Sequence, residues 1–104
     1  MLDAKAGVAP AVLLDALRAS PVGSRMMDSR GVQMVDHRFD PHIRLDLFLK
    51  NFRLMLEEGA RLDVPLPLTS VAQQLCTAAS AAGHGAEDLA AVITTLESLA
   101  GMRA

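Results

Sequence analysis

The sequence contains no tryptophan and no tyrosine, and three phenylalanines make up its aromatic content. Aromatic and β-branched residues favour strands, whereas alanine and leucine, which are abundant here, favour helices. The composition therefore predicts a helical protein. Because 51% of the residues are apolar, the chain can close a core, although a length of 104 residues keeps that core small.

The sequence also has a single cysteine, Cys76, and no long apolar run. One cysteine excludes an internal disulfide and fits a reducing compartment. No segment approaches the roughly 18 apolar residues of a membrane-spanning helix, and the N-terminus lacks the pattern of a signal peptide. We therefore expect a cytoplasmic protein with no membrane association.

A block of charge of one sign is missing as well. The formal net charge is −2, and the densest cationic stretch, residues 25–53, is interrupted by aspartates. A nucleic-acid-binding protein would show a sustained basic stripe. The charges instead predict a mixed, solvated surface and no nucleic-acid partner.

Metal and catalytic motifs are absent too. His37, His42 and His84 do not share a helix face, and no cysteine or carboxylate completes a ligand spacing around them. No serine lies in the glycine pattern of a nucleophile elbow. Cys76 falls in an alanine-rich helical segment, which favours a buried core thiol. We predict no metal site and no catalytic residue in this chain.

What is present is a series of short helical patterns, which predicts one all-α domain over residues 1–104, a bundle of five to six short helices. Residues 1–6 resemble the end of a longer helix cut at Met1. Pro10, suited to a first helical turn, begins the next. The predicted helices cover residues 1–6, 10–19, 24–35, 44–58, 68 to about 82, and 86 to about 100.

The apolar spacing predicts which face of each helix is buried. The strongest stripe belongs to residues 44–58, which we expect to end at Gly59. The stripes are Leu45, Phe48, Leu49, Phe52, Met55 and Leu56 in that helix; Leu13, Ala16 and Leu17 in the second; Leu68, Val71, Ala72, Leu75 and Ala79 in the fifth; and Leu89, Val92, Ile93, Leu96 and Leu99 in the sixth.

Lys50 lies opposite the stripe of the fourth helix and allows two interpretations. It can pair with Asp46 one turn earlier, in the favourable acid-before-base order. Alternatively, it is a cation aimed at the carboxylate or phosphate of a ligand, with Arg44 and Arg53 nearby. Both interpretations hold if the pair lies at the mouth of a cleft.

Several segments resemble a known family. Residues 39–51, FDPHIRLDLFLKN, are similar to the pattern F-x-P-G-F-x-x-x-L-x-x-K-D. Residues 64–69, VPLPLT, and 83–88, GHGAED, match V-P-L-P-L-T and G-x-G-x-x-D, and Gly23-Ser24 resembles a Gly-Ser before the third helix. In this order, the segments resemble the C-terminal domain of the β-hydroxyacid dehydrogenases, such as 3-hydroxyisobutyrate dehydrogenase and tartronate semialdehyde reductase, enzymes related to 6-phosphogluconate dehydrogenase.

The resemblance implies a two-domain, NAD- or NADP-dependent oxidoreductase. Its N-terminal Rossmann domain, which holds the cofactor, and its catalytic lysine would precede Met1. Lys50 corresponds to the family's second lysine and is therefore the expected cofactor-binding residue. The sequence departs from the pattern at His42, Ile43 and Asn51, where the family has Gly, Phe and Asp, so the resemblance leaves the substrate open.

We thus expect the chain to supply a cleft wall and oligomer contacts to a dehydrogenase, without activity or tightly bound cofactor of its own. The alternative is a stand-alone, non-catalytic helical module for dimerisation or interaction. A mean hydropathy of +0.27 indicates more apolar side chain than a small core absorbs. We expect a homo-oligomer, with residues 1–17 and parts of the last two helices at its interfaces.

Overall fold

The computed structural model describes residues 1–102, and it confirms the predicted all-α class. Within these residues there is no strand, and Arg44 and Asp88 form an isolated antiparallel bridge. The elements are α1 (Leu2–Lys5), α2 (Pro10–Arg18), the π-helical turn η1 (Met27–Gly31), α3 (Val32–Asp36), α4 (Leu45–Arg61), α5 (Pro67–Ala79), the π-helical turn η2 (Ser80–His84), the 3-10 turn η3 (Leu89–Ala91) and α6 (Val92–Leu99).

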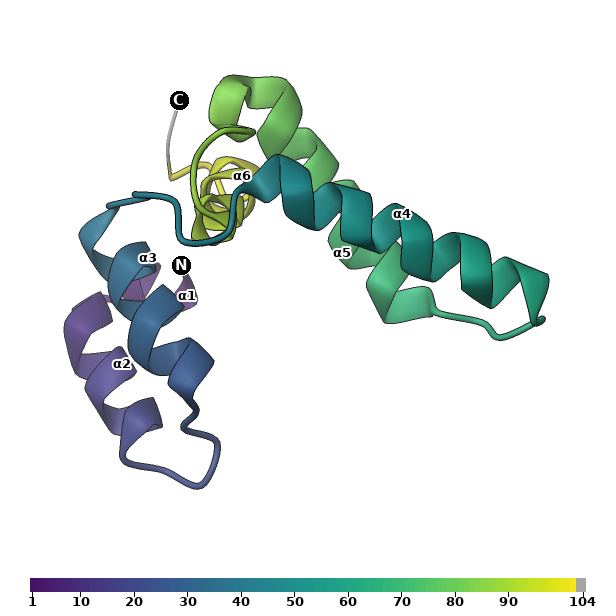
Figure 1. The fold of residues 1–104 in the computed structure, drawn as a ribbon. Coiled ribbons are helices and arrows are strands. Elements are labelled where there is room, and N and C mark those ends of the chain that lie inside the picture. The colour runs from purple at the N-terminus through teal and green to yellow at the C-terminus, as the bar shows by residue number, and fades with distance from the viewer. Residues whose placement is uncertain (103–104) are drawn as a thin grey trace.

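The helices form a bent molecule with two arms (Figure 1). Residues 1–37, which contain α1 to α3, form one arm, called here the N-terminal arm. Helices α4 and α5 pack against each other as a hairpin that extends in another direction. Helix α6 packs on α5 near the junction. The principal extents of 45 × 34 × 25 Å reflect this bend.

The core lies where α4, α5 and the start of α6 meet. Its buried apolar residues are Leu45, Phe52, Cys76, Ala79, Ala90 and Ala91. Small residues on α5 and η3 allow the backbones to approach closely, while Phe48 meets Phe52 edge to face at 4.9 Å. The prediction for the α4 stripe is confirmed for Leu45 and Phe52, whereas Met55 is 44% exposed and the other three residues of that stripe are half-buried.

The expected end of α4 at Gly59 is wrong, because the helix continues to Arg61. Gly59 is buried, and a Cβ there would lie 2.8 Å from Leu66 Cδ1 and 3.0 Å from the Val64 carbonyl oxygen. Asp63 ends the helix instead, with φ of 56°. The amide of Val64 donates to the Gly59 carbonyl at 2.8 Å, which closes a Schellman motif around Asp63.

The predicted inward faces of α5 and α2 also need correction. On α5, the prediction is confirmed for Ala79, which is buried, while Ala72 and Leu75 are half-buried. It is wrong for Leu68 and Val71, which are 85% and 58% exposed, and it missed Cys76, which is buried. On α2, Leu13 is exposed, whereas Leu14 lies against Gly31. In both helices several faces carry apolar residues, so periodicity alone does not choose among them.

The start of the last helix lies later than expected. Residue 86 lies in a turn, and the helical segment begins at Leu89 with Asp88 as its N-cap. The Asp88 side chain accepts a hydrogen bond from the Ala90 amide at 2.9 Å. The predicted stripe is half-buried except at Leu99, which is 75% exposed near the end of the helix.

Two glycines determine the packing of the N-terminal arm. A Cβ at Gly31 would lie 2.6 Å from Leu14 Cδ1, so glycine lets α2 approach η1 closely. A Cβ at Gly23 would lie 2.6 Å from the carbonyl oxygen of Arg18. The next residue, Ser24, accepts the Met27 amide at 3.1 Å and caps the following helical segment. The Gly-Ser pair therefore has a steric and a capping role.

None of the described helices is long and apolar enough to span a bilayer.

Candidate functional site

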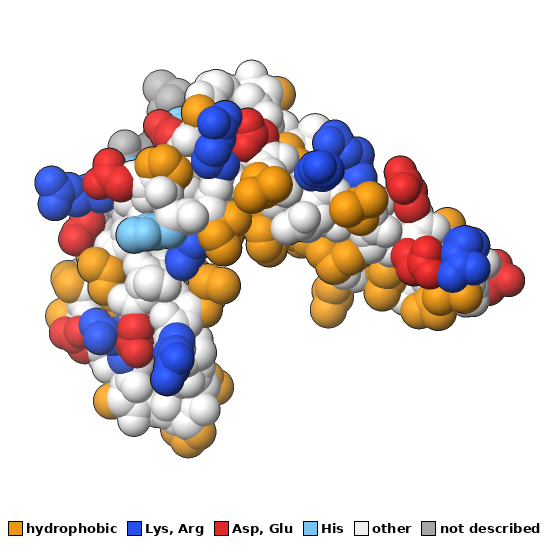
Figure 2. Space-filling view, viewed as in Figure 1, with side chains coloured by type: hydrophobic (Ala, Val, Ile, Leu, Met, Phe, Trp, Pro, Cys, Tyr) orange, Lys and Arg blue, Asp and Glu red, His pale blue; other side chains and the backbone are white. Residues whose placement is uncertain are grey.

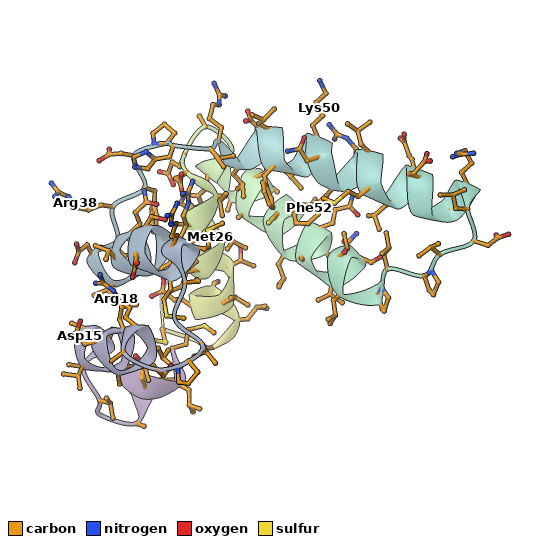
Figure 3. The ribbon with its side chains drawn as sticks, turned by 60° about the horizontal axis from the view of Figure 1, so that its bottom comes forward. Asp15, Arg18, Met26, Arg38, Lys50 and Phe52 are labelled. Carbon is orange, nitrogen blue, oxygen red and sulfur yellow. The ribbon has the colours of Figure 1, made fainter. Side chains whose placement is uncertain are left out.

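Lys50 projects from α4 on the side opposite the core. Figure 3 shows its side chain pointing away from the hairpin, whereas Phe52, two residues later, points toward α5. Lys50 is exposed, and the predicted pair with Asp46 is wrong. The Arg44 guanidinium donates hydrogen bonds to the two carboxylate oxygens of Asp46, from Nη2 to Oδ2 at 2.8 Å and from Nε to Oδ1 at 3.2 Å. This hydrogen bonding lowers the pKa of the Asp46 carboxyl group. Lys50 is therefore left available for an external anion.

Arg53 is the second exposed cation on this part of α4. Residues three apart are neighbours on a helix surface, so Lys50 and Arg53 lie close together. Figure 2 shows Lys and Arg side chains on the outer side of the bend, with hydrophobic side chains along its inner side. Two adjacent cations suit a phosphate or carboxylate, which are recognised by charge-assisted hydrogen bonds.

The beginning of α4 is held by the segment that precedes α6. The amides of Leu45 and Asp46 donate to the carbonyls of Glu87 and Gly85 at 2.9 and 3.0 Å. In return, the amides of residues 88 and 89 donate to the carbonyls of residues 39 and 43 at 3.0 and 2.9 Å. The sequence segments 39–51 and 83–88, which both carry family-like patterns, thus lie side by side.

The side chain of Asp88, which is fully buried, adds to these backbone hydrogen bonds between the two segments. Its carboxylate accepts the amides of His42, Ile43 and Ala90 at 2.9, 3.1 and 2.9 Å. Arg30 from the N-terminal arm adds a contact of 3.3 Å. Burial alone would raise the pKa of Asp88, but the three amide donors and the guanidinium outweigh it and hold the pKa below its usual value.

Two cavities lie among the described residues 1–102 near the junction of the arms, and Lys50 lines neither of these two. The larger one, about 660 Å³, lies between the linker after α3, the α5–η2 segment and α6. Its polar lining includes His37, His84, Glu87, Thr94, Thr95 and Ser98. The smaller one, about 390 Å³, lies between the N-terminal arm and α6. Ligand sites occur preferentially at domain interfaces. Because Lys50 is exposed and lies outside both cavities, it can contribute to such a site only where a second domain or subunit faces α4.

Sequence reasoning missed that two histidines reach one cavity. His84 Nδ1 lies 2.6 Å from Glu87 Oε2, and His37 Nε2 lies 2.9 Å from Glu97 Oε2. The second pair spans 60 residues, so spacing could not reveal it. Among residues 1–102, no three histidine, cysteine or carboxylate side chains are grouped to hold a metal ion.

The interpretation of Cys76 as a core thiol is confirmed. Cys76 forms no disulfide, and its thiol on α5 is buried in the core with Leu45 and Phe52 of α4. Desolvation by this burial raises the pKa of the Cys76 thiol. Because a buried thiol with a raised pKa is rarely a thiolate, it is unreactive.

Known proteins similar to this chain are dehydrogenases and reductases of hydroxy acids. It is 38% identical over 92 residues to L-threonate dehydrogenase of Escherichia coli K12, covering 88% of this chain and 30% of the relative. It is 30% identical over 100 residues to 2-hydroxy-3-oxopropionate reductase of the same strain, covering 96% and 34%. The chain thus spans about a third of the length of these relatives.

The fold has a solved counterpart. The crystal structure of a 3-hydroxyisobutyrate dehydrogenase from Salmonella typhimurium superposes with a TM-score of 0.84 and 36% identity, covering 89% of this chain and 33% of that one. Residues 1–96 match the family described as the NAD-binding domain of NADP-dependent 3-hydroxyisobutyrate dehydrogenase. The chain therefore belongs to this NAD-binding family of the 3-hydroxyisobutyrate dehydrogenases.

Proposed function

We propose that this chain is the helical C-terminal domain of an NAD- or NADP-dependent β-hydroxyacid dehydrogenase. It supplies one wall of the cofactor and substrate cleft and contributes oligomer contacts, and it is not catalytic alone. The observation that carries this role is Lys50, an exposed cation on a helix whose start is hydrogen-bonded to the family-like segment at residues 83–88. The partner of this domain is an N-terminal Rossmann domain joined before residue 1.

The residues at α4 fit an anionic nucleotide. Lys50 and Arg53 present two adjacent positive charges to solvent, where a phosphate or carboxylate of the bound molecules can reach them. The nicotinamide cofactor, when bound, supplies hydride transfer. Lys50 binds and orients charged groups at the edge of the cleft, and the helical domain excludes water from it.

The substrate class follows from the relatives. Their names include L-threonate and 2-hydroxy-3-oxopropionate, both small hydroxy acids that carry a carboxylate. We infer a small hydroxy acid for the complete enzyme of this domain. The buried, free Cys76 supports a reducing compartment such as the cytoplasm.

A second candidate is a non-catalytic interaction module. It is supported by the exposed apolar side chains on α1, α5 and α6, such as Leu2, Leu68 and Leu99. Such exposed apolar surface is typical of an interface. The same surface serves the first proposal, because oligomer contacts and the Rossmann domain would cover it.

A chimera distinguishes the two candidates. This chain replaces the matching 92 residues of Escherichia coli L-threonate dehydrogenase, and oxidation of small hydroxy acids is followed by NADH or NADPH formation. The chain alone is expected to show no turnover, whereas the chimera is expected to oxidise at least one hydroxy acid. A folded chimera that binds the cofactor but oxidises none of them contradicts the proposed function.

A further inference from the structure

Side chains of the N-terminal arm bind the rest of the molecule at two places, the α6 helix and the Asp88 carboxylate before it. Lys5 Nζ donates to the Ala100 carbonyl at 2.8 Å, at the end of α6. His37 bonds to Glu97 on α6, as described above. Arg30 differs, because it reaches the carboxylate of Asp88, which holds the start of α4. The Arg30 contact therefore couples the arm to the helix that carries Lys50.

The coupling runs through a single oxygen atom. Asp88 Oδ1 accepts the Arg30 guanidinium together with the amides of His42 and Ile43, while Oδ2 accepts the Ala90 amide. The side chains of Asp88 and Arg30 are 0% and 14% exposed. A largely desolvated ion pair is stronger and less screened by salt than a surface pair, provided that hydrogen bonds satisfy the carboxylate, as they do here.

We propose that Arg30 and Asp88 are positioning residues for Lys50, because their ion pair sets the angle between the N-terminal arm and α4. This inference rests on the proposed function, in which the cofactor-binding domain joins the chain before residue 1 and so moves with the arm. A change in the angle at the junction displaces the bound nucleotide relative to Lys50. The pair thereby fixes the distance over which Lys50 binds the anionic group.

The angle can be measured in the chain itself. Cysteines introduced at exposed positions, Val12→Cys on α2 and Glu57→Cys on α4, carry spin labels for a distance measurement by pulsed electron resonance. Cys76 is buried with a raised pKa and stays unlabelled. Arg30→Met removes the ion pair, and Arg30→Lys retains a cation. The matched control is Arg18→Met, which removes an exposed pair with Asp28 within the arm.

We expect one narrow distance in the parent and in Arg18→Met, a broadened and shifted distance in Arg30→Met, and recovery of the narrow distance in Arg30→Lys. In the chimera, Arg30→Met is expected to raise the cofactor KM about tenfold with a smaller change in kcat, because small displacements cost large factors in a preorganised site. Circular dichroism should stay unchanged in all three variants.

An unchanged narrow distance in Arg30→Met overturns the inference, as does a changed distance with an unchanged KM. Asp88→Asn is a second route to the same test, since it removes the charge and keeps one acceptor oxygen. Failure of the proposed function has a different signature. In that case Lys50→Ala leaves the KM unchanged, while the distance between the labels still responds to Arg30→Met.

Discussion

The two halves of the molecule are held together by different means. In the second half, α4, α5 and the α6 region bury six apolar residues, of which Leu45 and Phe52 are the largest. The N-terminal arm has no buried residue in α1, α2, η1 or α3. It relies on close helix contact at Gly31 and on side-chain bonds such as that of Arg30. Apolar burial is the larger stabilising term, so the second half should unfold last.

The largest expected effect is in the core. Leu45 is fully buried at the start of α4, and Leu45→Ala should lower the free energy of unfolding by about 2–5 kcal/mol. Leu68→Ala, at a leucine that is 85% exposed, should change it by less than about 0.5 kcal/mol. Urea denaturation followed by circular dichroism measures both, and equal losses would show that the core is elsewhere.

A smaller loss of stability is expected from a change in the N-terminal arm, and it should be confined to that arm. Gly23→Ala places a methyl group against the Arg18 carbonyl, and such overpacking costs about 1–3 kcal/mol. Amide hydrogen exchange should accelerate in residues 10–36 and stay slow in α4 and α5. Gly85→Ala is the control, because its nearest obstacle is the Ser80 hydroxyl, at 3.1 Å. Faster exchange throughout the chain would mean that the two halves unfold together.

The smallest expected change is a stabilisation at the tip of the hairpin. Asp63 adopts a left-handed conformation with φ of 56°, which glycine tolerates without strain. Asp63→Gly should therefore raise the free energy of unfolding by about 0.5–1 kcal/mol, net of the higher entropy of glycine in the unfolded chain. The control Ala60→Gly, within α4, should lower it by about 1 kcal/mol. A loss in Asp63→Gly would refute the helix-ending role of this residue.

The same contrast explains what the sequence could predict. The α4 face followed from one clear apolar stripe, and the family-like motifs identified the fold. The α5 face followed only in part. Ala79 is buried as predicted, but Leu68 and Val71 are exposed, because small residues such as Cys76 and Ala79 fill the narrow space next to α4. The roles of Arg30 and Asp88 depend on a contact 58 residues apart in sequence. Of these two residues, only Asp88 stood out in the sequence, as the last position of the family-like pattern at residues 83–88.

The role of Lys50 is the central claim, and the cofactor KM of the chimera tests it most directly. Arg61→Ala is the matched control, because Arg61 is an exposed cation at the other end of α4 and takes no part in attaching the N-terminal arm. Lys50→Ala should raise the cofactor or substrate KM about tenfold, since a charged hydrogen bond contributes roughly 1.5–3 kcal/mol, while the free energy of unfolding stays unchanged. Arg61→Ala should leave both KM values unchanged. Unchanged KM values in Lys50→Ala would contradict this role and show that Lys50 is an ordinary solvated side chain on α4.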